Sequence, residues 1–182
     1  MAFRLLLLLL VAFPAWAAEV AGVKIDDKMR VGNAELALSG AGLRRRVFFQ
    51  VYAIGLYVPD PKADRIAQPG PKRVLIHMLR DVGAEQFTEA LVEGIKANQS
   101  EAEAAALEPR IKQLAAIMNQ VGEAKKGMAI ALDWTGAETR VVIDGKPAGQ
   151  PIAGEDFYRA LLRIWLGDKP VQDDLKKALL GS

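Results

Sequence analysis

The chain has 182 residues, enough for one domain with a full hydrophobic core, and it contains no cysteine. Disulfides, zinc–thiolate sites and thiol nucleophiles are therefore excluded. Lysine and arginine number 24 against 22 aspartate and glutamate, and a formal net charge of +2 gives no electrostatic basis for nucleic-acid binding.

The first 18 residues, "MAFRLLLLLLVAFPAWAA", have the layout of a secretory signal peptide. A basic Arg4 precedes an apolar run, which ends at Pro14 and a small-x-small site at Ala15–Ala17. The run is too short to span a bilayer, although an uncleaved anchor is the alternative. We expect residues 1–18 to be removed, leaving a soluble periplasmic domain over 19–182 with a charge of about +1 and no stable membrane anchor.

Alternating apolar residues predict strands in the first half of the exported part. Short candidates occupy 20–25 and 34–39, and the longest, over 46–58, is apolar on both faces and should be covered on both sides. The segment 59–73 holds four prolines and a glycine and reads as a surface loop. A further strand follows over 74–79.

The second half begins with helical spacing. Phe87, Leu91 and Ile95 share one helix face. The stretch 100–103, "SEAE", is a capping box that starts the next helix, which should end at Gly122. Pro109 predicts a break near Glu108, or a new helix beginning there.

Strands return over 127–134 and 139–145, and two closing helices follow. The first carries Phe157, Leu161 and Ile164 and stops at Gly167. The second starts after Pro170. Strands joined by short turns pair antiparallel, so the predicted class is α+β, with an antiparallel sheet covered on one face by helices.

The stretch "GAGLRRRVFFQVYAIGLYVP", residues 40–59, resembles the chalcone isomerase superfamily. In that family a Gly-x-Gly-x-Arg turn, here Gly40, Gly42 and Arg44, leads into a central strand with an Ile-Gly-Val-Tyr-like tetrapeptide, here 54–57. "EQFTEALVEGI" and "TRVVIDGKPAGQPIAGEDFYRALLRIWLGDKP" continue the likeness in the same order. The closer similarity is to the bacterial exported branch, and it implies an open-faced sandwich with a ligand cleft between sheet and helices.

The resemblance also implies site residues. Arg44 matches the family arginine that holds the ligand's oxyanion. Tyr52 stands at a strand threonine that orders a water, Phe87 at a helix tyrosine, and Gly94 at a ligand-contacting asparagine. A serine or threonine belongs near "KPVQDDL", which has no hydroxyl. Cyclisation of an enone needs hydrogen-bond donors placed at the developing oxyanion, so we expect no competent chalcone isomerase and no catalytic residues.

The three arginines at 44–46 admit two interpretations. In the first, they guard the end of an apolar strand against aggregation. Alternatively, in a regular strand, Arg44 and Arg46 share the face of Tyr52, and Arg44 turns into an apolar cleft to grip a carboxylate. The predicted ligand-binding set is Arg44, Tyr52, Phe87 and Gly94.

His77 is the only histidine and lies on the face of Leu75 and Leu79 in the strand over 74–79. A satisfied sheet histidine is the expectation, and haem ligation is the functional alternative. No metal or cofactor is expected.

Three functions stay open at this point. The preferred one is a non-catalytic binding protein for a small amphipathic carboxylate or lipid, such as a fatty acid. The second is an isomerase or lyase of the chalcone isomerase type with a reworked site and an unknown substrate. The third is an envelope interaction protein whose cleft is closed.

Overall fold

The computed structural model describes residues 18–181. Nearly all of the predicted leader lies outside them, so its removal stays a prediction. No helix within the described residues is both long and apolar enough to cross a membrane.

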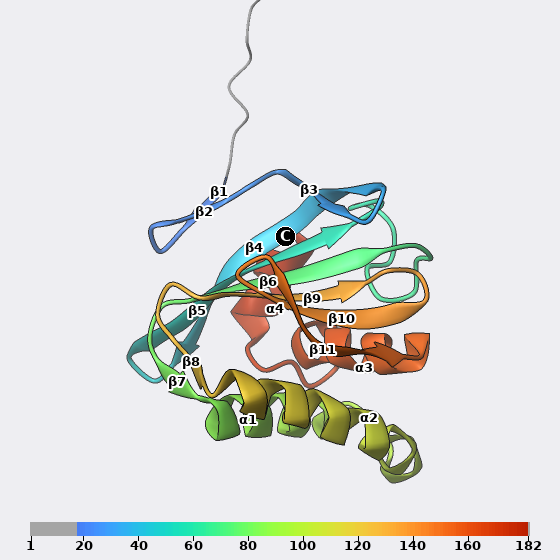
Figure 1. The fold of residues 1–182 in the computed structure, drawn as a ribbon. Helices are drawn as coiled ribbons and strands as arrows, with labels where there is room; N and C mark the ends of the chain where they lie inside the picture. The colour runs from blue at the N-terminus through green and yellow to red at the C-terminus, as the bar shows by residue number, and fades with distance from the viewer. Residues whose placement is uncertain (1–17, 182) are drawn as a thin grey trace, which may run out of the picture.

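A seven-stranded antiparallel sheet forms the centre of the molecule, in the order β11-β10-β9-β6-β5-β4-β3 (Figure 1). Its strands are β3 (Lys28–Val31), β4 (Ala34–Arg46), β5 (Phe49–Val58), β6 (Lys72–Met78), β9 (Ala129–Trp134), β10 (Glu138–Ile143) and β11 (Lys146–Ala153). Two small antiparallel pairs flank it: β1 (Ala18–Val20) with β2 (Val23–Ile25), and β7 (Val82–Gly83) with β8 (Glu123–Ala124). The predicted α+β class with an antiparallel sheet is confirmed.

Four helices lie on one side of this sheet (Figure 1). They are α1 (Ala84–Ala97), α2 (Glu101–Val121), α3 (Glu155–Leu166) and α4 (Asp173–Leu180). Their apolar faces meet the sheet in the main core, where Ile54, Ile76 and Phe157 are completely buried. Burying each such side chain stabilises the fold by about 1.5–3 kcal/mol.

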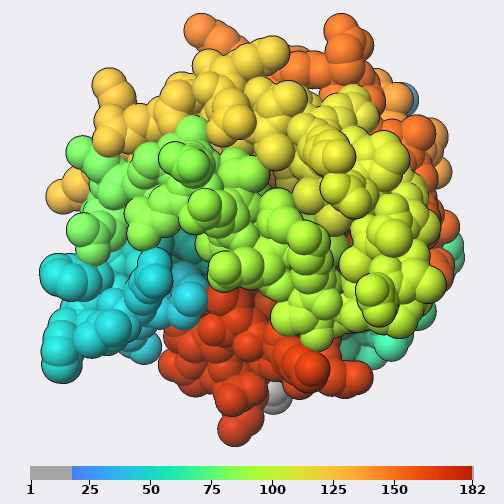
Figure 2. Space-filling model, turned by 90° about the horizontal axis from the view of Figure 1, so that it is seen from below, coloured from blue at the N-terminus to red at the C-terminus, as the bar shows by residue number. Residues whose placement is uncertain are grey.

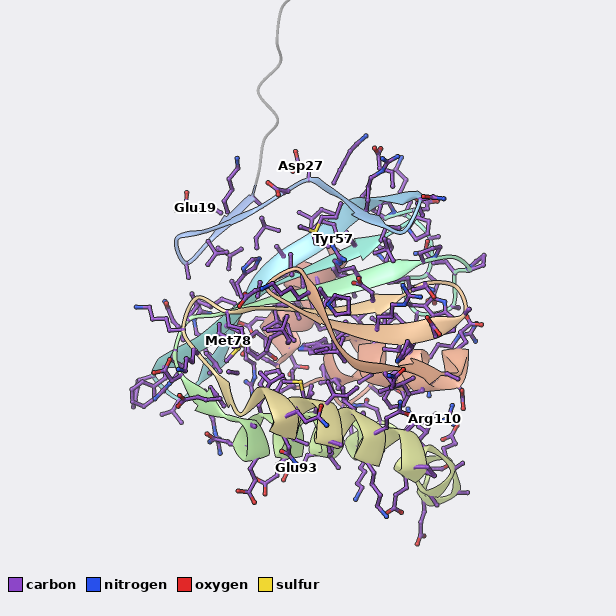
Figure 3. The ribbon with its side chains drawn as sticks, in the orientation of Figure 1. Glu19, Asp27, Tyr57, Met78, Glu93 and Arg110 are labelled. Atoms are coloured by element: carbon purple, nitrogen blue, oxygen red, sulfur yellow. The ribbon has the colours of Figure 1, made fainter. Side chains whose placement is uncertain are left out.

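The opposite face of the sheet carries a smaller core under β1 and β2. Ile25 packs there with Leu36, Tyr57 and Leu75. Figure 3 shows Tyr57 on this side, near Asp27, and its hydroxyl donates to the carbonyl of Asp26 at 2.9 Å. The expectation that the long central strand is covered on both faces is therefore confirmed for residues 51–58.

The start of the long strand was predicted wrongly. Residues 40–46 are the second half of β4, not a turn, and the chain reverses at Val47 and Phe48 before β5 begins at Phe49. Phe48 is 94% exposed at this hairpin tip. A run of apolar residues suggested an unbroken strand because Val47–Phe48 contains none of the glycine or asparagine that usually marks a two-residue turn.

Pro109 does not break its helix: α2 is continuous from its Ser100 capping box to the C-cap Gly122. A proline inside a helix costs about 3 kcal/mol. Leu107 and Ile111 flank Pro109 and are both buried, as is Leu114 one turn later. Their combined burial, at about 1.5–3 kcal/mol each, exceeds the loss and holds the helix together.

The glycines of β4 allow α4 to lie directly on the strand. A Cβ at Gly40 would fall 2.1 Å from the carbonyl oxygen of Ala178, and one at Gly42 would fall 2.6 Å from a methyl of Leu175. Close approach of two backbones, rather than a turn, explains the Gly-x-Gly pattern. This contact positions the segment before α4 against the end of β4.

We predict that Gly40→Ala lowers the free energy of unfolding by about 2–3 kcal/mol, because α4 must move away from β4. Urea denaturation followed by circular dichroism measures this loss. Gly83→Ala is the matched control, since a Cβ at Gly83 meets nothing within 4 Å and its φ is −59°. Its effect should stay within about 0.5 kcal/mol. Equal losses in the two variants would contradict the packing argument.

Candidate functional site

A cleft of about 810 Å³ opens between the sheet and the helices, beside the β4–β5 hairpin tip. Figure 2 shows a hollow where the hairpin (cyan), α1 (green) and the C-terminal segment (red) meet. Apolar side chains form most of the walls: Val51, Tyr52, Ile76, Phe87, Leu91, Ile164, Trp165 and Val171. Charged side chains also line it: Arg44, Arg46, Arg80, Lys169, Asp81, Glu89 and Glu93.

Arg44 reaches this cleft from β4. Its partner in the antiparallel register is Tyr52 of β5, and directly paired residues on neighbouring strands point to the same face. The two side chains therefore meet across the hairpin, although the strand that was expected to align them along one chain does not exist. The Arg44 side chain is half-buried.

Neutral oxygen atoms hold the Arg44 guanidinium. Nη1 donates to the carbonyl of Arg45 and, at 3.2 Å, to Oε1 of Gln172. Arg44 forms no ion pair with any carboxylate of residues 18–181. Its positive charge is thus oriented without being neutralised.

Gln172 is the residue that fixes this end of the cleft. It precedes α4, and its side-chain amide pairs with the exposed edge of β4: Nε2 donates to the carbonyl of Leu43 at 3.0 Å, and Oε1 accepts from the backbone N–H of Arg45 at 2.8 Å. The same Oε1 accepts from Arg44. One side chain therefore joins the strand edge, the arginine and α4.

Tyr52 and Trp165 form the polar part of the inner wall. The indole Nε1–H of Trp165 donates to the Tyr52 hydroxyl oxygen at 3.0 Å, and both residues are buried. Burial raises the pKa of Tyr52, while the Trp165 hydrogen bond and the nearby Arg44 charge oppose that rise. The hydroxyl stays protonated near neutral pH and donates to no residue among 18–181, so its proton can serve an acceptor in the cleft.

The other two predicted residues lie in the same cleft. Phe87 is buried on α1 and lines the wall. Gly94 also lines it, but a Cβ there would fall 2.8 Å from Ile164, so close packing of α1 against α3 already requires a glycine. Neither side chain can donate a hydrogen bond. The structure brings all four residues together, and their binding of a ligand remains a prediction.

His77 lies outside this cleft. It is half-buried on β6, beside Ala53 and Ala129, and burial lowers its pKa. The alternation along β6 turns it toward the smaller core, away from the helices.

Sequence reasoning missed Trp165, Gln172 and Arg80. Trp165 shares the helical spacing of the buried residues of α3 and therefore resembles ordinary core. Gln172 carries no local motif. Arg80 follows β6, and its guanidinium lies over the Phe49 ring, 4.6 Å from the centroid. These contacts connect residues far apart in the chain, and no spacing in the sequence signals them.

Comparison with known proteins now identifies the fold. The family model described as chalcone isomerase-like matches residues 17–181. No curated protein sequence matches the chain. The crystal structure of a fatty-acid binding protein of Arabidopsis thaliana, AtFAP1, is similar over 88% of this chain and 92% of that one, with a TM-score of 0.65 and 15% sequence identity. At that identity the likeness establishes the fold alone.

We predict that Tyr52→Phe lowers the free energy of unfolding by about 1–3 kcal/mol, because the buried Trp165 N–H loses its acceptor. In a Trp165→Phe background the donor is absent, and the same substitution should cost much less. Urea denaturation of the four proteins completes this double-mutant cycle. Equal costs in the two backgrounds would show that the hydrogen bond contributes nothing.

Alkaline pH should destabilise the fold. The pKa values of Tyr52, Tyr57 and Tyr158 are all raised, chiefly by burial. An unfolded tyrosine loses its proton near pH 10, whereas the native protein keeps it. Stability is therefore unaffected by these groups below about pH 10 and falls as pH rises beyond it. Urea denaturation midpoints measured at a series of pH values should fall above about pH 10. Phenolate absorbance recorded in the same samples should show that the tyrosines ionise only as the protein unfolds.

Proposed function

The chain belongs to the chalcone isomerase-like family, and we propose that its cleft binds a small amphipathic carboxylate, such as a fatty acid, without chemical conversion. The carboxylate would meet Arg44 and Tyr52, and the hydrocarbon chain would lie along the apolar walls of the cleft.

The observation that carries this proposal is the state of Arg44. A half-buried cation beside apolar walls is costly unless an anion or good hydrogen-bond acceptors compensate it. Here neutral oxygens orient the guanidinium but leave its charge unpaired. A planar guanidinium binds a carboxylate through two parallel hydrogen bonds, so the site suits that group.

Tyr52 adds a second donor on the same face. Its raised pKa keeps the hydroxyl protonated, and Trp165 occupies only the oxygen's acceptor role. A cation and a neutral donor from adjacent strands can together hold both oxygens of one carboxylate. A neutral ligand would form weaker hydrogen bonds with both Arg44 and Tyr52, because hydrogen bonds to an ionised acceptor are stronger.

The rest of the cleft suits a hydrocarbon chain. Its volume of about 810 Å³ lies within the roughly 300–1,000 Å³ typical of small-molecule sites. Most of its walls are aliphatic or aromatic, with the arginine at one side. The structural similarity to a protein named for fatty-acid binding supports the same class of ligand.

Two features favour binding over catalysis. Phe87 and Gly94 line the cleft and provide no side-chain donor for a developing oxyanion. Removing one such donor typically costs about 3 kcal/mol of transition-state stabilisation. The alternative, an isomerase or lyase with a reworked site, would depend on Arg44 and Tyr52 alone.

We also propose that the protein works in the periplasm of a bacterium, as a member of an exported branch of the family. The support is the signal-peptide pattern of residues 1–18. Cleavage can be tested directly by mass spectrometry of the protein secreted into the periplasm of an expression host, which should begin at Ala18 or Glu19.

We predict that Arg44→Gln weakens binding of palmitate to the delipidated protein by about 10–100-fold, the loss expected for a charge-assisted hydrogen bond. Isothermal titration calorimetry measures the affinity. Palmitate methyl ester, which lacks the carboxylate, should bind wild type more weakly by a similar factor and should be insensitive to the substitution.

Arg45→Gln is the matched control. Arg45 neighbours Arg44 on β4 but is exposed, and its only ion pair within residues 18–181 is with Asp174 at 3.6 Å. Palmitate affinity should therefore stay within about twofold. Unchanged palmitate affinity in Arg44→Gln would overturn the proposed role of Arg44. Turnover of a chalcone by wild type would favour the isomerase instead.

A further inference from the structure

The tip of the β4–β5 hairpin exposes three large apolar side chains in succession. Val47 is 79% exposed, Phe48 94% and Phe49 59%, and no other large hydrophobic residue of 18–181 is comparably exposed. Single exposed apolar residues are common, but a contiguous apolar projection marks a surface that another molecule covers. We call Val47, Phe48 and Phe49 the hairpin tip.

The backbone of the hairpin tip breaks the usual rule for turns. Val47 has a φ of 55°, in the left-handed region where a β-branched residue is an outlier. Glycine normally occupies the first position of such a two-residue turn. The sequence thus keeps valine where glycine fits better and phenylalanine where a polar residue would be solvated. Neither choice helps folding, and such conflicts typically mark functional positions.

Cations surround the hairpin tip. Arg45 and Arg46 precede it on β4, and Arg80 lies over the Phe49 ring. Acidic groups are also near: Asp174 pairs with Arg45, and Asp81 follows Arg80. Arg46 forms no ion pair with a carboxylate of 18–181.

The acids of α1 restrict how the hairpin tip can approach a surface. Glu89 and Glu93 are exposed on the other side of the cleft. A negatively charged surface would repel them, so it can be approached with the hairpin first and α1 turned away. The charges of the hairpin and of α1 therefore favour one orientation of the protein on a negatively charged surface.

The hairpin tip borders the mouth of the cleft. Val47, Phe49, Arg46 and Arg80 all line it, whereas Phe48 does not. Figure 2 shows the hairpin projecting beside the hollow and α1. Whatever covers the hairpin tip therefore lies next to the opening through which a ligand passes.

We propose that the hairpin tip inserts into the surface of an anionic lipid bilayer and holds the mouth of the cleft at that surface. Aromatic side chains are favoured at the membrane–water interface, and nearby arginines are attracted to anionic headgroups. The identity of the ligand rests on the proposed function: a fatty acid would pass between the bilayer and the cleft without crossing water.

A second copy of the chain is the less suitable partner. Two hairpin tips in contact would bring Arg45, Arg46 and Arg80 of both copies together, and like charges at close range repel. An anionic lipid surface reverses the sign of that interaction.

The test is co-sedimentation of the delipidated protein with vesicles and no added fatty acid. Equal-parts phosphatidylcholine and phosphatidylglycerol vesicles should bind wild type, pure phosphatidylcholine should bind it about tenfold more weakly, and added salt should weaken the binding. Phe48→Ser should lower binding to the mixed vesicles by about tenfold. Since Phe48 is exposed and does not line the cleft, its palmitate affinity in solution should be unchanged.

Arg46→Gln should also weaken vesicle binding, whereas Arg140→Gln, an exposed arginine on β10 paired with Glu138, should not. Wild type that binds palmitate but no vesicles overturns the proposal and leaves the proposed function intact. Hairpin-dependent vesicle binding without palmitate binding supports membrane docking and removes the fatty-acid function. Equal binding to both vesicle types, or a wild-type dimer that Phe48→Ser dissociates, overturns the proposed anionic surface.

Discussion

The close contact between α4 and β4 determines the geometry of the candidate site. Only a strand without side chains at Gly40 and Gly42 allows a helix to approach so closely. That approach brings Gln172, just before α4, onto the exposed edge of β4, where its amide pairs with the backbone and accepts from Arg44. Gly40 and Gly42 therefore position Arg44 indirectly, through α4 and Gln172, and not by shaping a loop around a ligand.

Two arginines on this sheet show how an unneutralised charge differs from a structural one. Arg73 on β6 is partly buried and forms a bidentate ion pair with Asp133 on β9. Its Nε donates to Oδ1 at 2.6 Å, and its Nη2 donates to Oδ2. Its charge is compensated within the fold. Arg44 is held at one side of an apolar cleft by neutral carbonyl and amide oxygens. The same residue type is paired with a carboxylate in one place and has no carboxylate partner among residues 18–181 in the other, which is why we propose an external anion there.

The sequence predicted the fold class and a common face for Arg44 and Tyr52, but the second prediction rested on an unbroken strand that does not exist. An unbroken strand would align them by alternation, whereas the hairpin aligns them by cross-strand register. Both arrangements place them on one face because side chains alternate on strands and pair across them. Apolar periodicity could identify the core of β5, but it could not locate a turn made of Val47 and Phe48.

The remaining errors share a physical cause. Local rules placed a break at Pro109, and burial on both sides of it kept α2 continuous. The strand β11 was missed because "KPAGQPIA" contains two prolines and a glycine, which suit an edge strand that pairs on one side only. Trp165 and Gln172 matter through partners more than a hundred residues distant in the chain. Contacts of this kind arise from packing, which no local pattern records.

In the two proposals, the hairpin tip and the arginine site would act on one and the same ligand. Two polar side chains at the cleft have partners within the fold: Trp165 pairs with Tyr52, and Gln172 with the edge of β4. The hairpin tip, in contrast, satisfies neither the turn preference of its backbone nor the solvation of its side chains. The two ends of a fatty acid have opposite requirements: the hydrocarbon chain is stabilised away from water, and the carboxylate requires a compensating charge or hydrogen-bond donors. In the proposed arrangement, the exposed apolar hairpin tip would keep the hydrocarbon chain out of water at the cleft mouth. The guanidinium of Arg44, which has no carboxylate partner among residues 18–181, would bind the carboxylate, so one ligand would account for both features.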